Sequence, residues 1–151
     1  MTYVLEMSTD TDIVQTTLNA GWSPISGRYQ WTSVNGKTCN LLAGSTVVII
    51  AHGNQKEIGN SSSGTIDIDA ARFLNLILSN CANGKTGLPA RIFLSVCAPN
   101  GIAQFTAAVV IEAEKQGIWG KVEFFGHTAS VAGPVPPYSS TSLDWTQIFV
   151  K

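Results

Sequence analysis

The chain has few charged side chains for its length. Only 13% of its 151 residues are Asp, Glu, Lys or Arg, whereas about a quarter is usual in soluble domains. The 9 basic and 10 acidic residues are scattered and give a net charge of −1. Binding to nucleic acid or to an anionic membrane requires a basic patch, so we expect neither partner. So little charge favours a sheet that is buried on both faces.

Cysteine is also scarce and widely spaced. The three cysteines are Cys39, Cys81 and Cys97, and no C-x-x-C pair occurs. A disulfide framework needs an even set of cysteines, and a zinc ribbon needs closely spaced pairs, so the sequence predicts neither. We expect no metal ion and no cofactor.

The chain lacks long apolar runs. The first residues, "MTYVLEMSTDTD", contain neither the basic start nor the apolar stretch of a secretory signal. The longest apolar run, Val47–Ala51, is too short to span a bilayer. These features predict a cytoplasmic protein, although export by a route without a signal peptide fits them equally well. A length of 151 residues suits one domain over residues 1–151.

The second half of the chain alternates between strand and helix patterns. Apolar, β-branched runs at residues 47–51, 91–96 and 121–128 are typical of buried strands. Residues 65–80 begin extended and then take helical spacing. Residues 100–116 repeat apolar side chains at the same spacing, and Gly117 can end that helix. This order predicts an α/β domain with a mostly parallel sheet. In such sheets, sites lie beyond the carboxyl ends of the strands.

The remaining segments are shorter. We expect a strand at residues 2–7, a helix at residues 8–21 and a hairpin that begins with a strand at residues 28–34. Residues 53–64 are polar and rich in glycine, which predicts a long exposed loop. Residues 143–150 predict a last strand or a short helix.

Two of the predicted strands stop at reactive side chains. "VVIIAHGN" ends its apolar run at His52, and "IFLSVCAPNG" ends its run at Cys97. If these strands are parallel neighbours about 4.8 Å apart, the imidazole and the thiol meet at one edge of the sheet. The N–H of Gly53 can then hold an oxyanion, and a helix that begins near residues 99–101 favours the thiolate of Cys97. Without a close third carboxylate, the pair would act as a dyad.

These residues resemble the caspase-like cysteine peptidases. "IIAHGN" is similar to the histidine block of that family, "IFLSVCAPNG" to its cysteine block and "GTIDIDAARFLNLI" to the stretch between them. The resemblance covers residues 45–130 and implies a three-layer caspase-like domain. It also implies a His52–Cys97 dyad, with an oxyanion hole formed by the N–H groups of Gly53 and Cys97. The expected activity is a cysteine endopeptidase that cleaves a protein or peptide substrate, or itself, without a cofactor.

Two other functions remain open. The caspase signature Q-A-C is replaced by Ser95-Val96-Cys97, and no pocket for a particular side chain can be assigned. The first alternative is therefore a catalytically inactive caspase-like domain with a binding or regulatory role. The second is a small α/β hydrolase of another kind, although the chain lacks a G-x-S-x-G nucleophile elbow.

Three further residues are candidates for substrate binding. His127 lies near the end of the third predicted strand, and it either lines the substrate cleft or has a structural role. Ser130 and Tyr138 belong to the proline-rich segment 129–142, which is either a substrate-binding loop or a plain connector.

Other reactive side chains have simpler explanations. Asp67 and Asp69 share a face of an extended segment, and capping of the following helix explains one of them. A metal site or an acid–base pair is the alternative. Cys39 and Cys81 do not end a predicted strand, so we expect both to pack in the core.

Overall fold

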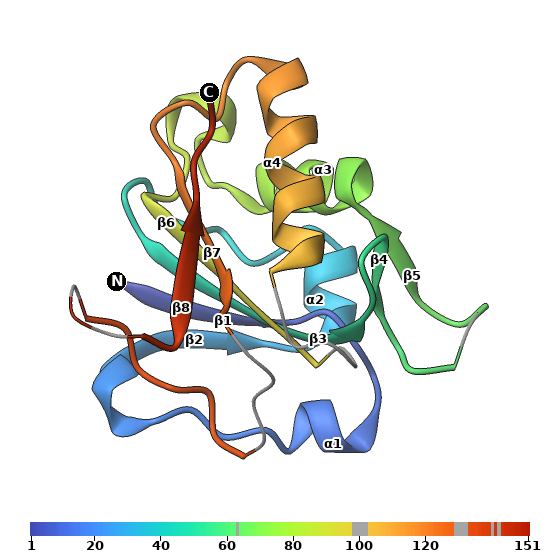
Figure 1. The fold of residues 1–151 in the computed structure, drawn as a ribbon. Coiled ribbons are helices and arrows are strands. Elements are labelled where there is room, and N and C mark those ends of the chain that lie inside the picture. The colour runs from blue at the N-terminus through green and yellow to red at the C-terminus, as the bar shows by residue number, and fades with distance from the viewer. Residues whose placement is uncertain (63, 98–102, 129–132, 140, 142) are drawn as a thin grey trace.

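A mostly parallel β-sheet runs through the centre of the fold (Figure 1). The computed structural model describes residues 1–62, 64–97, 103–128, 133–139, 141 and 143–151. Six strands form the main path of the sheet, in the order β2 (Ile25–Tyr29), β1 (Thr2–Glu6), β3 (Thr46–Gly53), β6 (Arg91–Cys97), β7 (Glu123–His127) and β8 (Trp145–Ile148). Among these described strands, β8 alone is antiparallel to its neighbour on the path.

The central strands are buried on both faces because successive side chains point to opposite sides of a sheet. In β3, Val47 and Ile49 belong to one apolar core, whereas Val48 and Ile50 belong to the other. All four side chains are buried. This arrangement accounts for the continuous apolar run that the sequence shows here.

Helices cover one of these faces, and shorter elements cover the other. The first core is shared with α2 (Trp31–Asn35), α3 (Ala70–Asn80) and α4 (Gln104–Gln116). The second core is shared with α1 (Thr11–Val14) and the 3-10 turn η1 (Ala20–Trp22). A second 3-10 turn, η2, spans Gly84–Thr86. The predicted α/β class with a mostly parallel sheet is therefore confirmed.

An aromatic cluster fills the second core. The Phe93 ring stacks on Phe125 at 4.4 Å between centroids, and it meets the edges of Trp22 at 5.0 Å and of Trp145 at 5.1 Å. Such aromatic pairs add about 0.5–1.5 kcal/mol beyond the apolar area that they bury. The cluster packs this face of the sheet tightly along β6 and β7, before the residues at the carboxyl ends of these strands.

Several sequence predictions are confirmed in detail. The segment 65–80 begins as the strand β5 (Asp67–Asp69) and continues as α3. The Asp69 side chain caps α3 by accepting a hydrogen bond from the Arg72 N–H at 2.8 Å. Gly117 ends α4 in the left-handed conformation, with φ +74°. Residues 145–148 form the last strand.

The predicted hairpin starting at residues 28–34 is wrong. Those residues complete the parallel strand β2 and then enter the short helix α2. Val34 of α2 is fully buried, so a side chain expected on a strand packs from a helix instead. Tertiary packing overrides the β preference of this aromatic, β-branched stretch.

The predicted loop at residues 53–64 is also partly wrong. Strand β3 continues through Gly53, and β4 (Glu57–Gly59) folds back on it before pairing with β5. Ile58 and Ile68 are buried partners across β4 and β5. A single apolar residue in each strand packs this hairpin against the core. One apolar residue within a polar segment does not give a recognisable strand pattern in the sequence.

The predicted helix at residues 8–21 is reduced to the four residues of α1. The Asp10 side chain does not cap α1, because its carboxylate accepts a hydrogen bond from the Ser61 N–H at 2.7 Å. Helix α4 begins at Gln104, and residues 98–102 lie outside the described ranges. Within those ranges, no helix has the length and apolar character needed to cross a bilayer.

Candidate active site

His52 and Cys97 lie side by side at the carboxyl edge of the sheet. Strands β3 and β6 are parallel neighbours, and His52 is paired in register with Cys97. Alternation along each strand places both side chains on the face that holds Ile50 and Ser95. Cys97 is exposed, and the His52 side chain is 19% exposed. The structure therefore brings together the imidazole and the thiol that the sequence singled out.

A carboxylate that sequence reasoning missed completes this group. His52 Nε2 lies 2.8 Å from Asp12 Oδ2 and 3.0 Å from Asp12 Oδ1. The hydrogen bond from His52 lowers the pKa of Asp12, so this carboxylate is ionised at neutral pH. Because a carboxylate only accepts hydrogen bonds, Nε2 carries the imidazole proton. A third side chain, which the sequence analysis did not anticipate, therefore lies against His52.

The topology explains how Asp12 reaches His52. Strand β1 lies beside β3 and runs in the same direction, so the chain leaves β1 at the same edge and enters α1 there. The segment is then tied to the loop after β4. Ser8 Oγ donates to Asn60 Oδ1 at 2.7 Å, and Asp10 accepts from the Ser61 N–H. The only sequence signal was an acidic "TDTD" after the first strand.

Asp10 is a second carboxylate close to the imidazole. Its Oδ2 lies 3.7 Å from His52 Nε2. Donor atoms of Asp10, Asp12 and His52 all lie within 4.8 Å of one another, and this is the one such set in the described ranges. These residues could hold a cation, but their hydrogen bonds to each other and to Ser61 already satisfy much of their capacity.

The environment of Cys97 opposes the thiolate. Although the residue is exposed, the protein surrounding it raises its pKa through desolvation, and the negative charge of Asp12 raises it further. The helix expected to begin near residues 99–101 and to favour the thiolate begins at Gln104. That expectation is therefore corrected: the described groups keep Cys97 as a thiol at rest.

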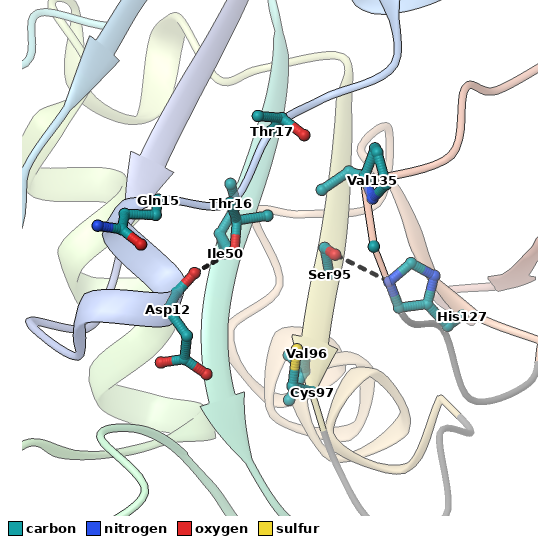
Figure 2. Close-up of a pocket in the computed structure, with 12 residues that line it drawn as sticks. Asp12, Gln15, Thr16, Thr17, Ile50, Ser95, Val96, Cys97, His127 and Val135 are labelled. Atoms are coloured by element: carbon teal, nitrogen blue, oxygen red, sulfur yellow. Dashed lines mark hydrogen bonds between the residues drawn. The ribbon is translucent and has the colours of Figure 1, made fainter.

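Cys97 lines two hollows in the surface. The larger hollow, of about 330 Å³, lies among Asp12, Thr16, Ser95 and His127 (Figure 2). The smaller hollow, of about 290 Å³, is lined by His52, Gly53, Asn54, Glu57, Ile58, Asn60, Ser61, Asp67 and Cys97. Cys97 therefore contributes to the walls of both hollows.

Gly53 ends β3 in a crowded position. A Cβ at this residue would lie 2.8 Å from the Glu57 carbonyl oxygen, Ile58 Cγ2 and Val96 Cγ1. Only glycine fits between β4 and β6 at this point. Gly53 lines the smaller hollow together with His52 and Cys97, and its oxyanion role stays a prediction.

The structure separates the three candidates for substrate binding. His127 is buried, lines the larger hollow and lies 2.8 Å from Ser95 Oγ through its Nε2. Tyr138 packs on Phe93 at 5.0 Å and on Phe125 at 4.8 Å, and it is not among the described residues that line either hollow. Ser130 lies outside the described residues.

The other reactive residues have structural positions. Asp67 accepts a hydrogen bond from the Gly64 N–H at 2.8 Å, and it lines the smaller hollow. Cys39 and Cys81 are buried, as expected, and burial raises the pKa of each thiol to about 11. Both therefore serve as internal controls for the reactivity of Cys97.

The buried imidazole of His127 predicts acid sensitivity. Desolvation lowers its pKa from 6.5 to about 4, against an opposing effect of Asp144. The unfolded chain therefore binds the proton more tightly, and folding stability is complete above pH 6.5 and falls as the pH drops towards about 4. At about 1.36 kcal/mol per pKa unit, we expect protonation of this residue to lower the free energy of unfolding by about 3 kcal/mol.

Urea unfolding across this pH range measures the loss. The His127→Gln variant cannot titrate there, so its stability should decrease less on acidification than that of the parent chain. Equal acid losses in the two proteins would contradict this account. The Asp12 pKa is also lowered, and its contribution is common to both proteins.

Comparisons of the chain with protein-family models, with curated proteins and with solved structures found no match.

Proposed function

We propose that the protein is a cysteine peptidase of the caspase-like type. The observation that carries the proposal is the pairing of His52 with Cys97 at one edge of the sheet, with Asp12 2.8 Å from His52 Nε2. Cys97 is the nucleophile, His52 moves protons, and Asp12 positions the imidazole. The expected substrate is a protein or peptide, and the chemistry requires no cofactor.

The hydrogen bond to Asp12 assigns the two imidazole nitrogens. Because Nε2 holds a proton for Asp12, Nδ1 offers its lone pair to the thiol. Cys97 Sγ forms a bond to the carbonyl carbon of the peptide as its proton passes to Nδ1. The oxyanion that develops is held by backbone N–H groups, for which Gly53 and Cys97 are the candidates.

Proton return completes the first half of the reaction. The C–N bond breaks, and the leaving nitrogen takes the proton from Nδ1, which leaves a thioester on Cys97. Water then adds to the thioester carbonyl and gives a proton to Nδ1. When the C–S bond breaks, that proton returns to sulfur, so the acid product and the original thiol are formed.

The raised pKa of Cys97 makes His52 essential to the first step. A thiol that is protonated at rest cannot attack until a base removes its proton. The same raised pKa also favours a second candidate function, a caspase-like binding domain in which the thiol never reacts. The two candidates differ in what His52 does for Cys97.

Labelling with a peptide-based electrophile distinguishes them. We expect a mixture of peptidyl acyloxymethyl ketones to modify Cys97 and to spare Cys39 and Cys81. In the His52→Ala variant the rate at Cys97 should fall at least about a hundredfold, in line with loss of general base catalysis. Mass spectrometry of tryptic digests measures each site.

Iodoacetamide serves as the control reagent. It reacts with the thiolate but makes no peptide contacts, so its rate at Cys97 should also fall in the His52→Ala variant if His52 removes the thiol proton. If the peptide reagent labels Cys97 at one rate in both proteins, or labels all three cysteines alike, the chain is a binding domain.

A further inference from the structure

We propose that the larger hollow beside Cys97 selects a side-chain amide, Gln or Asn, on the residue before the cleaved bond, and that it rejects Asp and Glu. This inference rests on the proposed function and names its substrate class.

The hollow lies on the acyl side of the thiol. His52 must protonate the leaving nitrogen, so the leaving half of the substrate lies beside His52. His52 and Cys97 both line the smaller hollow, which therefore takes that half. Cys97 also lines the larger hollow, together with Ser95 and Val96 before it in β6. The side chain that precedes the cleaved bond therefore enters the larger hollow.

A polar pair forms the floor of this hollow. Figure 2 shows Ser95 and His127 pointing towards each other from neighbouring strands. Both residues are buried, at 6% and 5% exposure, and His127 Nδ1 has no hydrogen-bond partner in the described residues. The His127 ring stacks on Trp145 at 4.3 Å between centroids. The pair is thus held in place before any ligand arrives.

This floor is suited to an amide because the Ser95 hydroxyl can form a further hydrogen bond besides the one to His127. If His127 Nε2 donates to Ser95 Oγ, the serine hydroxyl hydrogen is available to an acceptor. If Ser95 donates to Nε2, its oxygen lone pairs are available to a donor. A side-chain amide carries both an acceptor and donors, so it satisfies Ser95 in either case. An apolar side chain of the same size satisfies neither.

Charge at the hollow acts against acidic side chains. Among the described residues that line it, Asp12 is the one charged group, and Lys and Arg do not occur. Burial lowers the pKa of His127 to about 4, so the floor is neutral at pH 7. A carboxylate in this hollow would face Asp12 and would be desolvated without a cation, which is costly.

The size of the hollow is consistent with such a side chain. In Figure 2, Thr16 and Thr17 lie on one side of the hollow, and Val135 lies on the other side, which also holds His127. A hydrogen bond from the Val135 N–H to the Thr17 carbonyl, at 2.9 Å, ties these two sides together. The volume of about 330 Å³ accommodates one side chain of medium length and does not require the walls to move.

Matched peptide reagents test the proposal. Three acyloxymethyl ketones that differ only in the residue next to the reactive carbon carry Gln, Glu or Met, which are close in length. We expect the Gln reagent to label Cys97 about tenfold to a hundredfold faster than the other two, the size of effect that an unsatisfied buried hydrogen-bonding group produces.

The Ser95→Ala variant identifies the group responsible. It should lose the preference for Gln over Met, because the rate with the Gln reagent falls towards the rate with the Met reagent when the hydroxyl is absent. Ser45→Ala is the matched control, because Ser45 is also a buried serine but lies at the opposite end of the sheet, before β3. It should keep the preference, and thermal unfolding confirms that both variants fold.

The outcomes separate this inference from the proposed function. If no reagent labels Cys97, the peptidase itself is excluded. If Cys97 is labelled but Glu or Met reacts as fast as Gln, or if Ser95→Ala keeps the parent preference, the amide pocket is excluded and the peptidase stands. If Ser95→Ala abolishes labelling by all three reagents, Ser95 takes part in the reaction and is not a specificity group.

Discussion

Replacing Asp12 by Asn is expected to lower kcat/KM for peptide cleavage by about a hundredfold to ten-thousandfold. An asparagine amide can donate to His52 Nε2, which would move the imidazole proton to Nδ1. Nδ1, which the proposed mechanism assigns to the thiol, would then lack the lone pair that it needs. Asp12→Asn should leave the fold intact, because the Asp12 side chain is 67% exposed.

The same variant should make the Cys97 thiol easier to deprotonate, although it slows peptide cleavage. The charge of Asp12 helps to raise the pKa of this thiol, so its removal should lower the Cys97 pKa while cleavage becomes slower. Ultraviolet absorbance of the thiolate during a pH titration measures the first effect, and peptide hydrolysis measures the second. If Asp12 only supported the fold, its replacement would not lower the Cys97 pKa and slow hydrolysis at the same time.

Asp10→Asn is the matched control. It removes the same charge from the neighbouring carboxylate, which lies 3.7 Å from His52 Nε2. We expect less than about a tenfold loss of activity, since Asp10 does not set the imidazole proton. Cys97→Ala defines zero activity. If Asp10→Asn and Asp12→Asn lower kcat/KM by the same factor, the assignment of Asp12 as the positioning residue is wrong.

Gly59→Ala is expected to destabilise the fold by about 3–5 kcal/mol. Gly59 ends β4 opposite His52 and has φ +144°, a conformation that residues with a Cβ rarely adopt. A Cβ there would collide with the backbone carbonyl of Ile66 and would lie 2.9 Å from Ile66 Cγ2. The hairpin of β4 and β5 would have to open, and His52 would lose its neighbour on that side.

Gly64→Ala isolates the effect of the collision. Gly64 also has positive φ, at +83°, but a Cβ there meets no atom within 4 Å among the described residues beyond its chain neighbours. Its expected loss is about 1 kcal/mol, which reflects backbone strain alone. The free energy of unfolding in urea measures both variants. Similar losses would mean that the close approach at Gly59 contributes nothing.

The central strands and α3 were predictable because their signals are local. The run from Val47 to Ala51 has no polar interruption, and a strand buried on both faces requires that pattern. Asp69 and Gly117 mark a helix start and a helix end through side-chain capping and positive φ, which depend on nearby residues alone. These signals also located His52 and Cys97.

The contribution of Asp12 was not predictable in the same way. It depends on β1 lying beside β3 and on Asn60 and Asp10 joining two distant segments. The pairing of Ser95 with His127 likewise requires β6 and β7 to be neighbours in the observed register. No spacing along the chain expresses such contacts. Their discovery required the arrangement of the strands in space.

The protonated resting state of Cys97 has a consequence for oxidative damage. Peroxides attack thiolates and not thiols, and the first product, a sulfenic acid, can proceed to irreversible forms. A sulfur whose pKa is raised by its surroundings presents little of the vulnerable form while it is idle. The proton on the resting thiol would thus protect Cys97 from oxidation while no substrate is bound. Its transfer to His52 would start the reaction once a substrate is bound.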